Sequence, residues 1–114
     1  MLFRSDRKLK SMLGMCQKAG RLCSGETACE KALQNQTARL VIVAADASGN
    51  TTKKFVNKSF YYKVPCYTLF DREDLSNAIG KENRATIAVI DDGFAKRIEE
   101  MLKPIIGTDE RDGE

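Results

Sequence analysis

The stretch LVIVAADASGNTTKK, residues 40–54, joins two different patterns. Its first six residues are all apolar, which is typical of a β-strand that is covered on both faces. The run ends at Asp46, and the loop ASGN, residues 47–50, follows it. A strand covered on both faces needs helices on both sides of its sheet, so this stretch predicts an α/β fold.

A helix is predicted after this loop, because apolar and basic residues recur there at helical spacing. We expect its apolar residues to face the sheet and its lysines to face solvent. The inward set is Phe55, Val56 and Phe60, and the outward set is Lys53, Lys54 and Lys58.

Toward the N-terminus, the pattern predicts a helix with one apolar stripe, then a short strand over residues 21–24, then a second helix. Ser5 is the expected N-cap of the first helix, Gly20 its stop signal, and Ser24 the N-cap of the second. The stripe of the first helix consists of Leu9, Met12, Leu13 and Cys16.

Toward the C-terminus, two further strands are predicted, at residues 65–70 and 86–90, and each precedes a helix. Asp71 is the expected N-cap of the first of these helices, and Gly80 its stop signal. Asp91 or Asp92 is the expected N-cap of the second helix, and Pro104 is expected just past its end. The alternation predicts a three-layer α/β/α sandwich with a mixed, mostly parallel sheet of about four strands. Residues 1–104 form one domain, and the charged tail 105–114 is predicted to be disordered.

Composition excludes several classes of site. The chain has 114 residues, no histidine and four cysteines that never form a CxxC pair. Mixed Cys/His zinc sites and Ser–His or Cys–His nucleophile pairs are therefore absent. We expect the cysteines, Cys16, Cys23, Cys29 and Cys66, to be small core residues in a reducing compartment.

Other signs of an enzyme are also weak. The chain has no GxGxxG or GxxxxGK[ST] fingerprint for nucleotides. Asp46, Asp91 and Asp92 follow predicted strands, where α/β enzymes often place carboxylates, but helix capping explains each of them. No apolar run is long enough to span a membrane, and the first ten residues lack the apolar centre of a signal peptide. The sequence predicts a cytoplasmic, non-catalytic protein without metal or cofactor.

Charge divides the chain into two halves. Residues 1–63 carry 12 Lys and Arg against 4 Asp and Glu, whereas residues 64–114 carry 7 against 12. A basic half favours a polyanionic partner, although solubility alone also produces milder asymmetries.

The stretch SGETACEKAL, residues 24–33, lies in the basic half and has two interpretations. It is a capped helix start, or it is an anion site in which Gly25 allows close approach, backbone N–H groups face the ligand and Lys31 adds a charge. Periodicity alone favours the capped helix.

The order of motifs adds a resemblance. GETACEKAL, RLVIVAADASGNTTKK, VPCYTLFDREDLSNAIGK and ATIAVI follow one another along the chain. This order resembles the ribosomal protein L7Ae/L30e family of kink-turn RNA-binding proteins, in particular its small bacterial YlxQ-like branch. The resemblance covers about residues 9–102 and is most specific at 44–48, 50–54 and 75–81. It implies a non-catalytic protein with the same three-layer fold.

The resemblance also implies RNA-binding residues. In the family, a helix start of the form G-x-N-E-x-x-K enters the kink-turn, and a loop before the last strand closes over a protruding nucleotide. The matching candidates are Gly25, Glu26, Thr27, Ala28 and Lys31 at the helix start, Arg84, Ala85 and Thr86 in the loop 81–86, and Arg21 as a further phosphate contact.

Three residues depart from the family pattern. Thr27 stands where the family has Asn, Ala28 where it has Glu or Gln, and Ser76 where it has Gly. Ala28 carries no group that reads a base edge, so the departures weaken kink-turn specificity more than phosphate binding.

Two functions therefore remain open. The first is a monomeric, ribosome-associated protein that binds bent or bulged structured RNA. The second is a protein-interaction module that kept the fold and lost kink-turn recognition, as the acidic second half suggests. An α/β enzyme or nucleotide binder rests on fold analogy alone.

Overall fold

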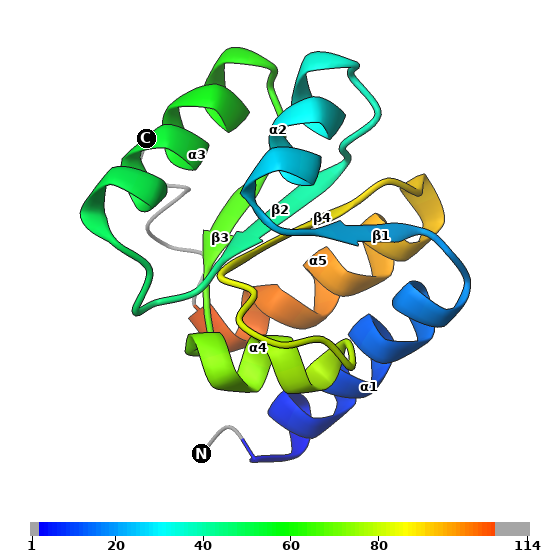
Figure 1. Cartoon of the computed structure of the whole chain (residues 1–114). Coiled ribbons are helices and arrows are strands. Elements are labelled where there is room, and N and C mark those ends of the chain that lie inside the picture. Colours follow the sequence, from blue (N-terminus) through cyan, green and yellow to red (C-terminus); the bar gives the residue numbers. More distant parts are fainter. Residues whose placement is uncertain (1–2, 107–114) are drawn as a thin grey trace.

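The computed structural model of the chain describes residues 3–106, which form five helices and four strands around one sheet (Figure 1). In chain order the elements are α1 Phe3–Lys18, β1 Leu22–Ser24, α2 Glu26–Gln34, β2 Leu40–Val43, α3 Gly49–Tyr61, β3 Cys66–Thr68, α4 Arg72–Ala78, β4 Thr86–Val89 and α5 Asp92–Ile106.

The strands are ordered β1-β4-β2-β3 across the sheet. β2 and β3 pair in parallel, whereas β4 pairs antiparallel with both β1 and β2. The expectation of a mixed, four-stranded sheet is confirmed, but the expectation that it is mostly parallel is wrong. The short helix α4 does not carry the chain back along the sheet, so β4 starts at the edge where β3 ends and runs in the opposite direction.

The core has two parts, one on each face of the sheet. Val41 and Val43 of β2 pack with α2 and α3, in a cluster that includes Leu33 and Phe55. Their neighbours along β2, among them Ile42, pack on the other face with residues of α1, α4 and α5. Figure 1 shows these two helical layers on either side of the sheet. The three-layer α/β/α architecture is therefore confirmed.

Helix α3 is rotated relative to its prediction. Its buried residues are Thr51, Phe55 and Ser59, which form a stripe of the i, i+4, i+8 type along the helix. Val56 and Phe60 each lie one position further around, so they are exposed and their expected inward orientation is wrong. Residue type misled the prediction, because two hydroxyl side chains face the sheet in place of two apolar ones.

Two predicted helix boundaries are also wrong. α1 begins at Phe3, so Ser5 lies inside the first turn of the helix and not at its N-cap. α5 continues to Ile106, so Pro104 lies in its last turn, where a proline removes only one hydrogen bond from the ladder. Ile105 and Ile106 thus end this helix, and the rest of the predicted tail lies outside the described residues.

Candidate nucleic-acid interface

One edge of the sheet brings together the beginnings of three helices and a loop. β1, β2 and β3 all end at this edge, and β4 begins there. The chain enters α2, α3 and α4 directly after those strand ends, and the loop 81–85 precedes β4. Segments that are far apart in the sequence therefore meet at one surface (Figure 1).

The turn into α2 requires glycine. Gly25 has φ 93° and ψ 153°, a conformation that is essentially restricted to glycine. Its N–H donates to the Thr86 carbonyl at 2.9 Å, which fixes the turn to the first residue of β4. A Cβ placed on Gly25 would have no atom within 4 Å, so the space above the turn is open.

The predicted Ser24 cap is wrong. No side chain caps α2, and Gly25 occupies the N-cap position. Ser24 belongs to β1, and its hydroxyl accepts a hydrogen bond from Arg84 Nε at 3.0 Å. The hydroxyl thus joins the two segments that the sequence predicted as the site.

The first N–H groups of α2 remain open. Within residues 3–106, the backbone N–H groups of Glu26, Thr27 and Ala28 make no hydrogen bond. Open N–H groups at the positive end of a helix dipole form a binding site for an anion.

Helices α3, α4 and α5 are capped instead, although α5 begins at the opposite end of the sheet, where β4 ends. Ser48 Oγ accepts from the Thr51 N–H at 3.1 Å, at the start of α3. Asp71 accepts from the Asp74 N–H at 2.8 Å, at the start of α4, as predicted. Asp91 accepts from the N–H of Phe94 at 2.8 Å, so it is Asp91 that caps α5. Asp46 accepts the Arg72 N–H at 2.8 Å, so it contacts the start of α4 rather than the helix that follows it in sequence. Asp92 is the first residue of α5 and does not cap it, so capping explains Asp91 but not Asp92.

The loop 81–86 is tied to α4 by Ser76, the residue that replaces the family's glycine. Ser76 is only 4% exposed. Its Oγ accepts from the Arg84 N–H at 2.7 Å and donates to the Arg84 carbonyl at 3.1 Å. The Arg84 side chain then extends to Ser24, so one residue connects α4, the loop and the end of β1.

Glu26 connects α2 to α3. Its carboxylate accepts from Thr51 Oγ1 at 2.6 Å and from Lys54 Nζ at 2.9 Å. Lys54 also pairs with Glu30 at 3.2 Å. The hydrogen bonds from Thr51 and Lys54 lower the pKa of Glu26, and those from Lys54 to Glu26 and Glu30 raise the pKa of Lys54. The sequence analysis missed Thr51 and Lys54, because a contact across 25 residues leaves no local signal.

The predicted site residues separate into a cluster and outliers. Thr27 and Lys31 are exposed on α2, and Lys31 has no ion-pair partner in the described part of the chain. Ala28 and Ala85 are half-buried beside them. The Thr86 side chain is 0% exposed, so it faces the core and cannot contact a ligand. Only the Thr86 carbonyl takes part in the candidate site, by accepting the hydrogen bond from the Gly25 N–H.

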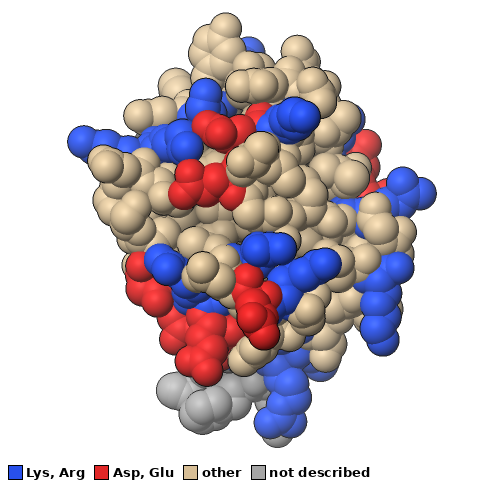
Figure 2. All heavy atoms as spheres, viewed as in Figure 1, with Lys and Arg blue, Asp and Glu red and all other residues tan. Residues whose placement is uncertain are grey.

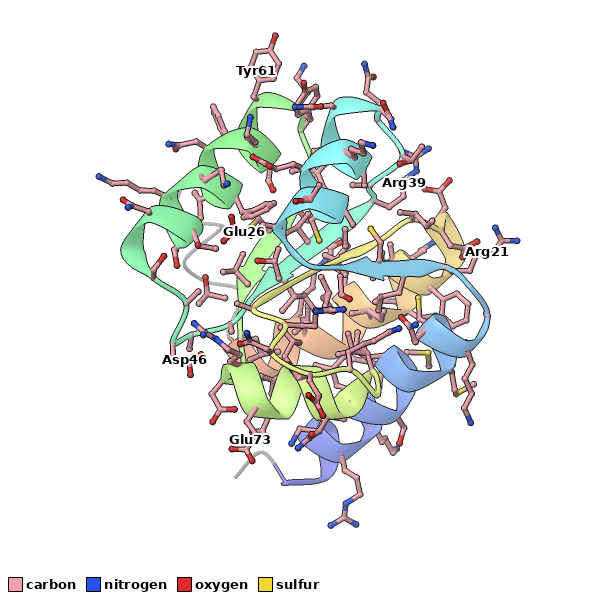
Figure 3. The ribbon with its side chains drawn as sticks, in the orientation of Figure 1. Arg21, Glu26, Arg39, Asp46, Tyr61 and Glu73 are labelled. Atoms are coloured by element: carbon pink, nitrogen blue, oxygen red, sulfur yellow. The ribbon has the colours of Figure 1, made fainter. Side chains whose placement is uncertain are left out.

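Arg21 lies apart from this cluster. It precedes β1, whereas Gly25 follows the other end of that strand, and it pairs with Asp91 at 3.9 Å. Figure 3 shows Arg21 pointing outward on the far side of the molecule from Glu26. Arg21 is therefore not positioned to share a ligand with Gly25 and Lys31.

The charges around this edge are mixed. Figure 2 shows basic side chains over α2 and α3 with acidic ones between them, and side chains of both signs over α4. A hollow of about 500 Å³ lies between α4 and the loop 81–83, next to Asp46 and Arg72. Lys54 pairs with both acidic residues of α2, Glu26 and Glu30, and compensates part of their charge. Lys31, in the last turn of α2, has no ion-pair partner within residues 3–106.

Comparison with known proteins identifies the family of this chain. A model of the ribosomal protein L7Ae/L30e/S12e/Gadd45 family matches residues 7–99, which is most of the chain. The chain belongs to this family. The resemblance inferred from the order of motifs is thus confirmed.

Two curated relatives carry the same name. The RNA-binding protein YlxQ of Enterococcus faecium is 39% identical over 97 residues, which cover 85% of this chain and 93% of the relative. The protein of that name from Bacillus subtilis (strain 168) is 42% identical over 91 residues, which cover 80% of this chain and 91% of the relative.

Solved structures support the fold. A Bacillus halodurans protein of unknown function superposes with a TM-score of 0.81 and 36% identity, covering 84% of this chain and 97% of its own. The 15.5 kD RNA-binding protein of Giardia lamblia superposes with a TM-score of 0.75, covering 88% of this chain and 86% of its own. Its identity is 16%, so this second likeness concerns the fold alone.

Between residues 3 and 106, no three His, Cys, Asp or Glu side chains gather in a way that would hold a metal ion. None of the helices in that range is both long and apolar enough to cross a membrane.

Proposed function

We propose that this chain is a non-catalytic RNA-binding protein that holds bent or bulged structured RNA at the sheet edge. The observation that carries the proposal is the uncapped start of α2, where the N–H groups of Glu26, Thr27 and Ala28 have no hydrogen-bond partner within residues 3–106. The name of the two relatives, RNA-binding protein YlxQ, supports RNA as the anion. We further propose that the protein works as a monomer on ribosomal RNA in the cytoplasm.

A phosphate group of the RNA binds at the open N–H groups, and Lys31 adds a positive charge one helical turn away. Gly25 permits this approach, because nothing projects from its Cα into the space above the turn. The loop 81–85 contacts the next part of the RNA. Arg84 is held in place by the Ser76 and Ser24 hydroxyls, and the Ala85 carbonyl accepts from the Ala44 N–H at 2.8 Å, so the loop needs little reordering when RNA binds.

Thr27 and Ala28 determine how selective this interface is. A good bidentate contact to a base edge contributes about 1–3 kcal/mol of discrimination, and Ala28 offers no such contact. The preference for bent RNA therefore comes from shape. The α2 start and the loop 81–85 lie side by side, joined by the Gly25–Thr86 and Arg84–Ser24 hydrogen bonds, so they contact the two RNA strands where a bend brings these close together.

Removal of one charge tests the location of this interface. We expect Lys31→Ala to weaken binding to a bulged RNA and to reduce the slope of log K against log salt by about one. Lys8→Ala is the matched control, because Lys8 is an exposed lysine of α1 in the opposite helical layer. Equal losses for the two variants would contradict the proposed position of the site. Binding to a protein partner with no RNA affinity at low salt would favour the interaction-module alternative.

A further inference from the structure

Helix α3 presents large side chains to solvent that no packing role explains. Phe60 is 85% exposed, Tyr61 is 75% exposed and Val56 is 43% exposed. Phe60 and Tyr61 lie next to each other in the last turn of α3. Figure 3 shows Tyr61 projecting from the end of α3 that is farther from Glu26.

The same helix surface is basic. Residues 49–63 contain four lysines and no Asp or Glu. Glu26 and Glu30 engage Lys54, whereas Lys53, Lys58 and Lys63 have no ion-pair partner among residues 3–106. The positive charge on this part of the surface is therefore not compensated. This favours a polyanion such as RNA over an apolar protein segment.

The spacing places lysine and aromatic rings on one side of the helix. Lys53, Asn57 and Tyr61 follow each other at i, i+4 and i+8, and Phe60 lies at i+7. These four residues and Val56 are called the α3 face here. The Tyr61 ring packs against the Tyr62 ring in a T-shaped arrangement, with ring centroids 4.9 Å apart and ring planes at 89°. Its position is thus partly ordered before any ligand binds.

We propose that the α3 face binds a single-stranded segment of RNA that continues from the RNA held at the start of α2. Unpaired bases stack on Phe60 and Tyr61, and phosphates contact Lys53 on this face and Lys58, which lies three positions before Tyr61 at its margin. Exposed aromatic rings beside unpaired lysines are the two components that sequence-tolerant binding of single strands needs. This inference rests on the proposed function, and it adds a second contact surface to it.

The two surfaces lie within reach of one RNA strand. Thr51, which contacts Glu26 at the first surface, and Tyr61 are ten positions apart on α3. At 1.5 Å per residue they are separated by about 15 Å along the helix axis. At about 3.4 Å per stacked nucleotide, a single strand of about four nucleotides spans that distance.

The test compares three RNAs that share one bulged duplex. The first has flush ends. The second carries five unpaired uridines at its 5′ end, and the third carries them at its 3′ end. Wild-type protein is expected to bind one of the extended versions about tenfold more tightly than the flush RNA. In Phe60→Ala/Tyr61→Ala that advantage disappears, while affinity for the flush RNA stays unchanged. Met15→Ala, which removes an exposed apolar side chain of α1, keeps the advantage.

Several results would overturn the inference. Equal affinity of wild-type protein for flush and extended RNA shows that the α3 face takes no single strand, and leaves the proposed function standing. Absence of binding to either RNA rejects the proposed function and this inference together. A wild-type dimer in sedimentation that becomes monomeric in Phe60→Ala/Tyr61→Ala assigns the face to self-association instead. Thermal unfolding checks that the exposed substitutions leave the fold intact.

Discussion

Ser76→Ala tests whether one hydroxyl holds the loop 81–86 in place. The substitution removes Oγ and leaves the rest of α4 unchanged. In the wild-type protein Oγ accepts from the Arg84 N–H at 2.7 Å and donates to the Arg84 carbonyl at 3.1 Å. No other partner of these two backbone groups lies within residues 3–106, so both lose their hydrogen bonds.

The expected loss of stability follows from these bonds. Each hydrogen bond contributes about 1 kcal/mol to the free energy of unfolding. Because the Ser76 side chain is only 4% exposed, water cannot readily take the place of its hydroxyl in the variant. Alanine recovers about 0.5 kcal/mol through its higher helix propensity. The net loss is about 1.5 kcal/mol, which lowers the unfolding temperature of a domain of this size by about 6 °C.

Thermal unfolding followed by circular dichroism measures the effect, with Asn77→Ala as the control. Asn77 is the next residue of α4 and is exposed, so its substitution is expected to change stability by less than about 0.5 kcal/mol. Hydrogen exchange adds a local measurement, because the Arg84 amide should exchange faster in Ser76→Ala than in either other protein. The reasoning is refuted if Ser76→Ala unfolds at the wild-type temperature and the Arg84 amide exchanges at the wild-type rate.

Three further substitutions or treatments have defined outcomes. Gly25→Ala is expected to destabilise the protein by about 1–3 kcal/mol in chemical denaturation, because alanine is strained at φ 93° although nothing blocks its Cβ. Thr51→Val removes a hydrogen bond to Glu26, whose pKa is lowered in the folded protein. That bond stabilises above the ordinary pKa of 4.5, so the wild type should exceed the variant by about 0.5–1 kcal/mol at pH 7 and lose the advantage as the pH falls through the lowered pKa of Glu26. The hydrogen bond with Cys29 lowers the pKa of Cys23 to about 7, whereas burial raises that of Cys16 to about 12, so iodoacetamide should modify Cys23 first, with a rate that rises as the pH passes about 7.

The sequence predicted the layers of the fold because its strongest patterns are local. Residues 40–43 are apolar without interruption, and the structure buries every one of them in β2. Asp71 and Asp91 cap helices whose starts are visible from a few neighbouring residues. Strand direction is not a local property. The place of β4 between β1 and β2 depends on how α4 lies at the sheet edge, and no residue pattern in 72–89 reports it.

The candidate site comes from the resemblance and stays a prediction, and the structure changes the contacts expected of several of its residues. Gly25 occupies the N-cap position of α2, as expected from a turn that needs glycine, whereas Lys31 lies in the last turn of that helix. Ser24 caps nothing, because Arg84, sixty residues later, takes its hydroxyl. Long-range contacts of this kind, like that of Thr51 with Glu26, arise only when the sheet brings separate helix starts to one edge.

The measurement that tests the central claim most directly is a titration of the protein against two labelled RNAs of equal length. One contains a kink-turn, the other is an uninterrupted duplex, and each is measured at two salt concentrations. The account predicts tighter binding to the kink-turn RNA, with affinity for both RNAs falling as salt rises, because phosphate contacts dominate. Equal affinity for the two RNAs would contradict recognition of bent RNA. Absence of binding to both at low salt would contradict RNA binding itself.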